Sequence, residues 1–336
     1  MTSSLVVQTS FLGDVILTTP LIAELAKRGP VDVVTTPAAA ALLANNPAIR
    51  AGYIFDKRGK SSGPLGLLRS AAQLRIGKYD AAYLAQGSHR SGLLAVGAGI
   101  ARRIGFDTSA GRLWYTHKVK HRSDRHHAER LWRLAAGDAA PDPAPDMLRP
   151  RLYPGEAERS AVDNFLRGVP RDGTPLLAVA PGSVWGTKRW PHYPALAARL
   201  AAMHRIVVIG SAEDSELAAA IAAAAGAGRV LDATGKLSLL ASAELISRCA
   251  AIVTNDSSPL HLASAMGTPT VAIFGPTVPA FGFGPLAPSR AIAEIALECR
   301  PCSSHGPDTC PLGHFKCMKL LEVNRVADLV LAAPQR

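Results

Sequence analysis

The chain has 336 residues, of which 48% are hydrophobic and 19% charged, so it holds enough apolar material for two buried cores and is not intrinsically disordered. Its 37 Lys and Arg outnumber its 26 Asp and Glu, which gives a formal net charge of +11 and a pI of about 9.7. This balance indicates an anionic partner, which is a nucleic acid, a phosphorylated ligand or a membrane surface. Glycine and proline follow no period, which excludes collagen-like and coiled-coil structure.

The first segment of the chain is apolar but does not have the pattern of a signal peptide. It has no cationic start and carries Asp14 inside its apolar stretch, so we expect a strand and a turn there. No apolar run reaches the ~20 residues that span a bilayer. The five cysteines are odd in number and lie mostly near the C-terminus, which is typical of a protein with reduced thiols. The sequence therefore predicts a cytoplasmic protein.

Short apolar runs alternate with helical segments along the whole chain. Strands are expected in the first half at residues 5–7, 31–34, 52–55 and 79–85, and in the second at 176–180, 205–209, 252–254 and 270–274. Helices are expected at residues 15–27, 191–203, 215–225 and 237–248. This pattern is typical of α/β domains, whose parallel sheets are covered by helices on both faces.

A proline-rich stretch at residues 141–154 separates the two halves, because dense proline suits neither a helix interior nor a central strand. We therefore place a domain boundary between residues 150 and 175 and expect a ligand cleft between two similar domains. In such sheets, ligands bind at the carboxyl ends of the strands.

Asp14 follows the first expected strand, in the turn Thr9–Asp14 at the start of a helix. One interpretation is that its carboxylate caps the helix or complements the helix dipole. The other is that it serves as a general base facing the cleft.

A second unusual turn, Ala180–Pro191, follows the strand at 176–180 and places Lys188 just before a helix led by proline. A lysine beside a helix N-terminus indicates a phosphate site, whereas the alternative is a solvated basic turn. The spacing differs from that of a Walker A loop, because Arg189 stands where that loop needs Ser or Thr.

The segment Asn255–His261 follows the strand at 252–254 and combines Asp256 with two small hydroxyl residues, Ser257 and Ser258. Such a group at a helix start can hold phosphate or sugar oxygens, or its members can simply cap the helix. A weaker turn signal, Gly275–Thr277, follows the next strand.

Two common nucleotide-binding patterns are missing from the sequence. A dinucleotide fingerprint begins at Gly97 and Gly99 but has Arg102 at the third glycine position. No two Asp residues are separated by a single residue, so the Asp-x-Asp pair of metal-dependent nucleotide sites is absent. We therefore expect no metal or other cofactor in catalysis.

Four cysteines, Cys299, Cys302, Cys310 and Cys317, lie close together in the sequence with histidines between them. Four thiols at this density suit a structural zinc ion or an iron–sulfur cluster. The alternatives are free packing thiols or a conditional disulfide.

A basic run at residues 100–133 contains several histidines and two aromatic residues. It is either a solvated face or a surface for an anionic acceptor or membrane. A nucleic-acid partner is not expected, because the chain has no RNA-binding or recognition-helix motif.

Together these motifs resemble one known family. The segments LVVQTSFLGDVILTTPL, PGSVWGTKRWP and TNDSSPLHLASAMGTPTVAIFGPT resemble the bacterial ADP-heptose:lipopolysaccharide heptosyltransferases of glycosyltransferase family 9. The tail CRPCSSHGPDTCPLGHFKCM is similar to the heptosyltransferase II branch. The resemblance implies a GT-B fold, with two Rossmann-like doubly wound domains facing a central cleft. The corresponding divisions are an acceptor-binding domain at 1–165, a nucleotide-sugar domain at 175–322 and a C-terminal helix at 323–336.

The resemblance also implies roles for individual residues. Asp14 matches the catalytic base, and Lys188 matches the lysine that contacts the donor diphosphate. The other implied donor contacts are Ser183, Thr187, Glu213, Asp256, Ser257, Ser258 and His261. The chain departs from the family's Asp-Thr/Ser-Gly donor loop, since it has Asp256-Ser257-Ser258-Pro259 there.

The implied reaction is an inverting transfer of heptose from ADP-heptose to a hydroxyl of the lipopolysaccharide inner core, an acceptor of the Kdo–lipid A type. The implied place of action is the inner face of the cytoplasmic membrane, which the protein contacts peripherally. The alternative enzyme is an epimerase or another GT-B glycosyltransferase that uses a different sugar.

Overall fold

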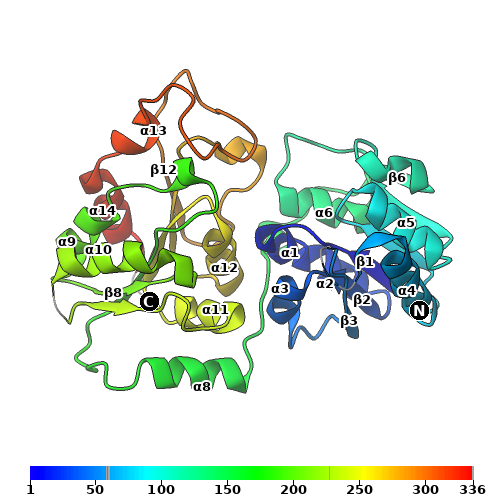
Figure 1. Cartoon of the computed structure of the whole chain (residues 1–336), viewed down its shortest axis with the longest axis horizontal. Coiled ribbons are helices and arrows are strands. Elements are labelled where there is room, and N and C mark those ends of the chain that lie inside the picture. Colours follow the sequence, from blue (N-terminus) through cyan, green and yellow to red (C-terminus); the bar gives the residue numbers. More distant parts are fainter. Residues whose placement is uncertain (58, 60, 227, 335–336) are drawn as a thin grey trace. The chain divides into compact units, whose positions relative to one another are not determined.

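The computed structural model describes residues 1–57, 59, 61–226 and 228–334, and the chain divides into two compact units, Met1–Tyr153 and Pro154–Arg336. Each unit contains one six-stranded parallel sheet with helices between successive strands (Figure 1). The division falls earlier than the expected domain end at residue 165. The reason is that helix α8 (Glu156–Phe165) packs against α11 (Leu239–Ser247) of the second unit.

The first unit contains these elements in chain order: β1 (Ser4–Val7), α1 (Leu12–Leu17), α2 (Thr19–Ala26), β2 (Val31–Thr35), α3 (Pro37–Ala40), η1 (Ala41–Leu43), β3 (Ala51–Ile54), α4 (Gly63–Arg75), β4 (Ala81–Leu84), α5 (His89–Gly97), β5 (Arg102–Phe106), η2 (Ala110–Trp114), β6 (His117–Val119), α6 (His127–Ala136) and α7 (Pro145–Leu148).

The strand order of the first sheet is β3-β2-β1-β4-β5-β6, with all neighbours parallel. The strands β1, β2 and β4 are buried along their whole length, which explains their apolar runs, interrupted in β2 by the buried Asp32. Strands β1, β2 and β3 follow one another toward one edge of the sheet. Strands β4, β5 and β6 then follow one another from β1 toward the other edge. The carboxyl ends of β1 and β4 therefore form the switch point at which such sheets bind ligands.

The expected helix at 15–27 is divided in two. Pro20 has no backbone N–H and its ring opposes the carbonyl four residues earlier, so the helix bends at Thr18. The Thr18 hydroxyl donates to the Asp14 carbonyl at 2.7 Å and accepts from Gln8 Nε2 at 3.1 Å. These two hydrogen bonds hold α1, which carries Asp14, against the residue that follows β1.

The second unit contains α8 and α11, already given, and these further elements: β7 (Leu176–Ala180), η3 (Gly186–Lys188), α9 (Tyr193–Leu200), β8 (Arg205–Val208), η4 (Ala212–Asp214), α10 (Ser215–Ala225), β9 (Val230–Asp232), β10 (Ala251–Asn255), α12 (Ser258–Met266), β11 (Thr270–Ile273), η5 (Pro279–Phe281), β12 (Arg290–Ala293), α13 (Lys316–Lys319) and α14 (Val323–Leu331).

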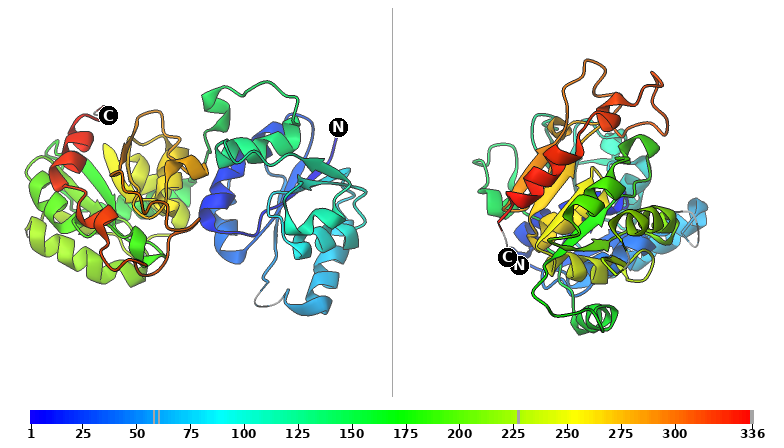
Figure 2. Two further views of the ribbon diagram at one scale, coloured as in Figure 1. Left: turned by 90° about the horizontal axis from the view of Figure 1, so that it is seen from above. Right: turned by 90° about the vertical axis from the view of Figure 1, so that its left-hand side faces the viewer.

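The second sheet has the order β12-β11-β10-β7-β8-β9, which is the same topology with its switch point between β7 and β10. Helix α14, which lies in the expected C-terminal division at 323–336, belongs to this unit. Its residues Val326, Ala327 and Val330 are buried in the same core as β7 and β10, and Figure 2 shows α14 in red beside the strands.

The structure contains four strands that the sequence pattern does not reveal, namely β5, β6, β9 and β12. β6, β9 and β12 are edge strands, and β5 lies next to an edge strand. β5 begins with Arg102 and Arg103, so its buried residues 104–106 do not stand out as a strand in the sequence. The predicted doubly wound α/β architecture is confirmed, because both sheets are parallel and share the strand order given above. Within the described part of the chain, no helix has the length and apolar character needed to cross a membrane.

Candidate active site

Asp14 lies in the first turn of α1, just beyond the carboxyl end of β1. Its carboxylate accepts a hydrogen bond from the backbone of Phe11, the N-cap residue, so it does contribute to the helix start. Burial nevertheless outweighs this bond and the nearby Arg130, and it raises the pKa of Asp14 to about 6. A carboxylate with this pKa is ionised at neutral pH and is a stronger base than an exposed one.

Helix α6 places two side chains beside Asp14. His127 Nε2 lies 3.4 Å from Asp14 Oδ1, and both side chains are partly buried. Arg130, one turn further along α6, is buried and interacts electrostatically with the same carboxylate. Neither residue stands out in the sequence as a site residue, because both lie among the many cations and histidines of the basic run. A pair of adjacent histidines at a helix start is the one available signal.

Two further cations lie at the same edge of the first sheet. Lys57 Nζ donates to the Thr9 carbonyl at 3.1 Å, and the Arg90 guanidinium donates to the backbone carbonyls of Lys57 and Ser61. Arg90 also lies over the ring of Phe55, 5.7 Å from its centroid. Burial and the Arg90 charge lower the pKa of Lys57. This concentration of positive charge beyond β1 and β3 suits an anionic group of a ligand.

The basic run itself is less available than its composition indicates. Arg103 donates to three backbone carbonyls, and Arg133 pairs with Glu129 and Asp142. Arg122 and Arg125 pair with acidic residues that include Asp124. The run therefore forms β5, β6 and α6, and several of its cations are engaged in internal ion pairs or backbone hydrogen bonds.

In the second unit, Lys188 and Asp256 form a buried ion pair at the switch point. Lys188 Nζ lies 2.6 Å from Asp256 Oδ2 and donates to the Asp256 carbonyl at 3.2 Å. The Thr277 hydroxyl, beyond β11, donates to the same carboxylate oxygen at 2.7 Å. Asp256 thus holds the Lys188 ammonium at the carboxyl ends of the central strands, which is where sheets of this topology bind ligands.

Asn255, which ends β10, joins the two loops of this switch point. Its Oδ1 accepts from the Trp190 N–H at 3.3 Å and from the Tyr193 hydroxyl at 3.2 Å, while its Nδ2 donates to the Pro181 carbonyl at 2.9 Å. A buried amide with three bonds fixes the Ala180–Pro191 turn relative to β10. Neither Asn255 nor Thr277 is predicted as a site residue from the sequence, since an isolated Asn or Thr at a strand end is common in turns.

The remaining predicted donor residues are distributed around this pair. Ser183 accepts from the Trp185 N–H at 3.3 Å, and the buried Thr187 binds the Pro307 carbonyl through both its N–H and its hydroxyl. Ser257 is the N-cap of α12 and Ser258 is its first residue. These four residues flank the turns that carry Lys188 and Asp256.

Two predicted donor residues lie in different environments. Glu213 is exposed on η4, beyond the carboxyl end of β8, whereas His261 is buried in α12. The His261 ring makes an edge contact with Phe283, with the two ring centroids 6.4 Å apart. The geometry therefore places Glu213 at the rim of the sheet edge and His261 in the packing of α12.

The cysteine segment, residues 299–317, borders the turn that carries Lys188. Its Cys302 N–H donates to the Pro276 carbonyl at 2.8 Å, and the Thr187 bonds to Pro307 hold the segment against this turn. Arg300 anchors it further, by donating to the carbonyls of Phe274 and Thr277 and pairing with Glu294. The cysteine segment is thus one wall of the Lys188 turn and not a detached tail.

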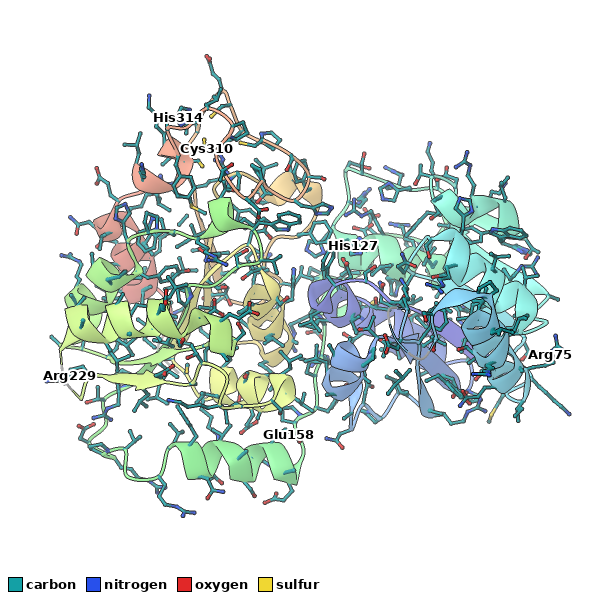
Figure 3. The ribbon with its side chains drawn as sticks, in the orientation of Figure 1. Arg75, His127, Glu158, Arg229, Cys310 and His314 are labelled. Carbon is teal, nitrogen blue, oxygen red and sulfur yellow. The ribbon has the colours of Figure 1, made fainter. Side chains whose placement is uncertain are left out.

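The thiols of this segment lie near one another: burial raises the pKa of Cys302, and the neighbouring Cys299 and Cys310 raise it further. All five cysteines are free, and among the residues that the structure describes no three His, Cys, Asp or Glu side chains are arranged to hold a metal. Cys310, labelled with His314 in Figure 3, accepts a hydrogen bond from the Phe315 N–H at 3.4 Å. Backbone bonds of this kind lower the pKa of Cys310, whereas burial raises that of Cys317 to about 11.

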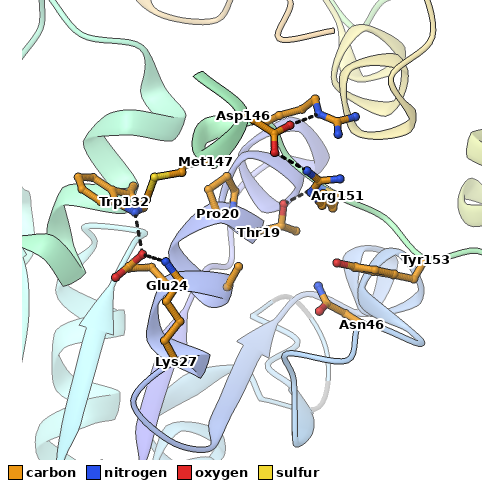
Figure 4. A pocket seen from close by; sticks show the side chains of 12 residues that line it. Thr19, Pro20, Glu24, Lys27, Asn46, Trp132, Asp146, Met147, Arg151 and Tyr153 are labelled. Carbon is orange, nitrogen blue, oxygen red and sulfur yellow. Dashed lines mark hydrogen bonds and ion pairs between the residues drawn. The ribbon is translucent and has the colours of Figure 1, made fainter. Parts of the chain in front are cut away.

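A separate cavity of about 210 Å³ lies in the first unit, between α2, α6 and the segment around α7 (Figure 4). Its polar groups pair with one another: Trp132 Nε1 donates to Glu24 at 3.3 Å, and Asp146 binds Arg151 at 2.8 Å. It is lined by none of the predicted site residues. The cavity is therefore separate from the side chains of Asp14 and Lys188 at the two sheet edges.

The edges of the two doubly wound sheets carry a desolvated carboxylate and a buried lysine, which are features of an enzyme active site. The model of glycosyltransferase family 9 (heptosyltransferase) matches residues 67–312. The chain belongs to glycosyltransferase family 9, the heptosyltransferase family, and is a glycosyltransferase. The resemblance noted in the sequence is thereby confirmed.

Individual relatives span nearly the whole chain. It is 32% identical to lipopolysaccharide heptosyltransferase 2 of Escherichia coli K12 over 295 residues, which cover 82% of this chain and 84% of that protein. It is 31% identical to the Salmonella typhimurium protein of the same name, with the same coverage. The structure of E. coli ADP-heptose lipopolysaccharide heptosyltransferase II matches with a TM-score of 0.81 and 26% identity, over 99% of this chain and 98% of that one. The expectation of a GT-B fold is confirmed.

Proposed function

We propose that this glycosyltransferase moves heptose from ADP-heptose to the inner core of lipopolysaccharide, in the manner of the heptosyltransferase 2 relatives. The choice of substrates is supported by those relatives, which include an ADP-heptose lipopolysaccharide heptosyltransferase II of known structure. The observation that carries the chemistry is Asp14, a partly buried carboxylate with a pKa of about 6 beyond the central strand of the first sheet. Such a group suits the deprotonation of a sugar hydroxyl.

The reaction is a direct displacement with inversion. Asp14 takes the proton of the acceptor hydroxyl while the hydroxyl oxygen forms a bond to the anomeric carbon of the heptose. The bond between that carbon and the ADP oxygen breaks, and ADP leaves with the electron pair. Lys188 neutralises the charge that develops on the diphosphate, and Asp256 and Thr277 keep the ammonium in place.

The donor contacts proposed for the second unit are Ser183, Thr187, Lys188, Glu213, Asp256, Ser257, Ser258 and His261. The acceptor contacts belong to the first unit, where Lys57 and Arg90 supply positive charge near the strand end that carries Asp14. Their partners are the acidic groups of a phosphorylated, Kdo-containing core. The enzyme acts in the cytoplasm, in peripheral contact with the membrane that holds the acceptor.

The test is a transfer assay with ADP-heptose and two truncated lipopolysaccharide cores, one ending before the first heptose and one ending after it. We expect transfer to the core that already carries one heptose. Incubation with ADP-heptose alone is the control for the epimerase alternative. Conversion of the donor sugar without acceptor, or transfer only from another sugar nucleotide, would refute the proposed function.

A further inference from the structure

The first residue of α6, His127, lies against the carboxylate of Asp14 and is labelled in Figure 3. The distance from Nε2 to Oδ1 is 3.4 Å, and the two side chains are 16% and 19% exposed. Both groups are therefore largely shielded from water, where a polar contact has more effect on orientation than it has on the surface. Nothing in the sequence pattern of the catalytic turn points to this histidine.

The backbone of His127 is held in place by the packing of α6. The ring of His126, the N-cap, accepts the Ala128 N–H at 3.1 Å and fixes the helix start. Further along, Leu131 and Leu134 are fully or almost fully buried, and α6 packs on both α1 and α2. Since α1 carries Asp14, this packing sets the distance between the imidazole and the carboxylate.

We propose that His127 is a positioning residue for the transfer reaction, whose Nε2–H holds Oδ1 of Asp14 so that Oδ2 is directed to the acceptor hydroxyl. The inference rests on the proposed function, in which Asp14 is the base. A carboxylate on a short helix rotates about its side-chain bonds unless one oxygen is held. A misplacement on the order of 1 Å costs roughly 100-fold in rate.

The contact also predicts the direction of a pH effect. In the proposed role, a hydrogen bond from the imidazole N–H favours the ionised carboxylate, so the proposal expects the pKa of Asp14 to rise when His127 is replaced by an apolar residue. The groups that face Asp14 from α6 are His127 and Arg130. Of the other elements packed on α1, α3 has no titratable side chain, and α2 contributes Glu24, which is bound to Lys27 and Trp132.

The first experiment compares His127→Leu and His127→Gln in the transfer assay. We expect His127→Leu to lower kcat roughly 10- to 100-fold, to leave the KM for ADP-heptose unchanged and to move the acid limb of kcat to higher pH. His127→Gln keeps an N–H donor and should restore much of kcat. The matched control is His117→Leu, because His117 is an exposed histidine on β6 of the same basic run. Calorimetry of ADP binding checks that each variant is folded.

The second experiment separates this inference from the proposed function. Asp14→Asn tests the base directly, and a near-normal rate would refute the base assignment itself. If His127 acts through Asp14, adding His127→Leu to Asp14→Asn should lower the residual rate no further. Equal losses in both backgrounds, or an acid limb that does not move in His127→Leu, would overturn the positioning role while leaving the proposed function intact.

Discussion

The two sheets share one strand order, yet the polar groups beyond their central strands are in opposite electrostatic situations. In the first unit, burial outweighs the nearby Arg130 and raises the pKa of Asp14 to about 6. In the second, Asp256 lies 2.6 Å from Lys188 Nζ and 2.7 Å from the Thr277 hydroxyl. The same topology thus presents a desolvated base at one edge and a closed ion pair at the other. The neighbouring side chains, and not the strand order, decide which chemistry an edge supports.

The largest effect is expected from removing the Asp14 carboxylate at the edge of the first sheet. Asp14→Asn should lower the transfer rate by ~10²–10⁴, the contribution of a positioned general base, while ADP affinity stays that of the parent. In the parent, kcat should rise with pH and level off above a midpoint near 6, since the ionised form of Asp14 is the active one. The measurements are kcat as a function of pH on both sides of that midpoint and ADP calorimetry. A variant with parental kcat would leave Asp14 with only its helix-start role.

At the other edge, removing Lys188 should cost both binding and stability. Lys188→Ala leaves the Asp256 carboxylate buried without its cation, which destabilises a fold by about 3–5 kcal/mol. It also removes a charge-assisted contact to the diphosphate and should weaken ADP binding. Since the chain has no Asp-x-Asp pair, ADP affinity should be the same with and without EDTA.

The double variant Lys188→Ala/Asp256→Asn is the control for this prediction. It removes both charges, so it should regain thermal stability but not ADP affinity. If ADP affinity returned together with stability, Lys188 would be a structural residue and not a donor contact.

Removing Asp14, unlike removing Lys188, should increase the stability of the folded protein, because the pKa of Asp14 is raised. The folded state binds a proton at Asp14 more tightly than the unfolded state does, so ionising Asp14 lowers the free energy of unfolding. This loss is complete above about pH 6 and absent below about pH 4. Asp14→Asn should therefore stabilise the protein at neutral pH by about 1–2 kcal/mol, less than the whole shift implies because solvent reaches part of the carboxylate. Thermal melts at neutral pH and about two pH units lower should show the gain shrinking at the lower pH. A loss of stability at both pH values would identify a helix cap.

The smallest effect separates the cations at the first sheet edge from those in the basic run. Lys57→Gln should raise the acceptor KM by an amount corresponding to about 1 kcal/mol, and the change should be largest at low salt. Arg122→Gln, the matched control, removes a charge that is already paired with Asp124 and should change the KM less. Equal effects in the two variants would mean that diffuse charge alone attracts the acceptor.

Much of the fold is predictable because buried parallel strands need continuous apolar runs. The central strands β1, β4, β7 and β10 have such runs and β2 has one interrupted by Asp32, whereas β5 begins with two arginines and does not stand out as a strand. Asp14, Lys188 and Asp256 are each marked as candidate site residues by their place after a strand. Their environments are not predictable, because desolvation depends on what packs over a side chain and not on its neighbours in sequence.

The sequence by itself determined the two doubly wound sheets and the strand ends at which polar residues gather, because apolar runs and turn residues act over short distances along the chain. Only the tertiary structure decided which of those residues meet. The Lys188–Asp256 pair joins residues 68 positions apart, and the Asp14–His127 contact depends on α6 packing against α1. Such contacts form where segments from distant parts of the chain cover the same sheet edge. Residues that are neighbours in the sequence do not reveal which segments meet there.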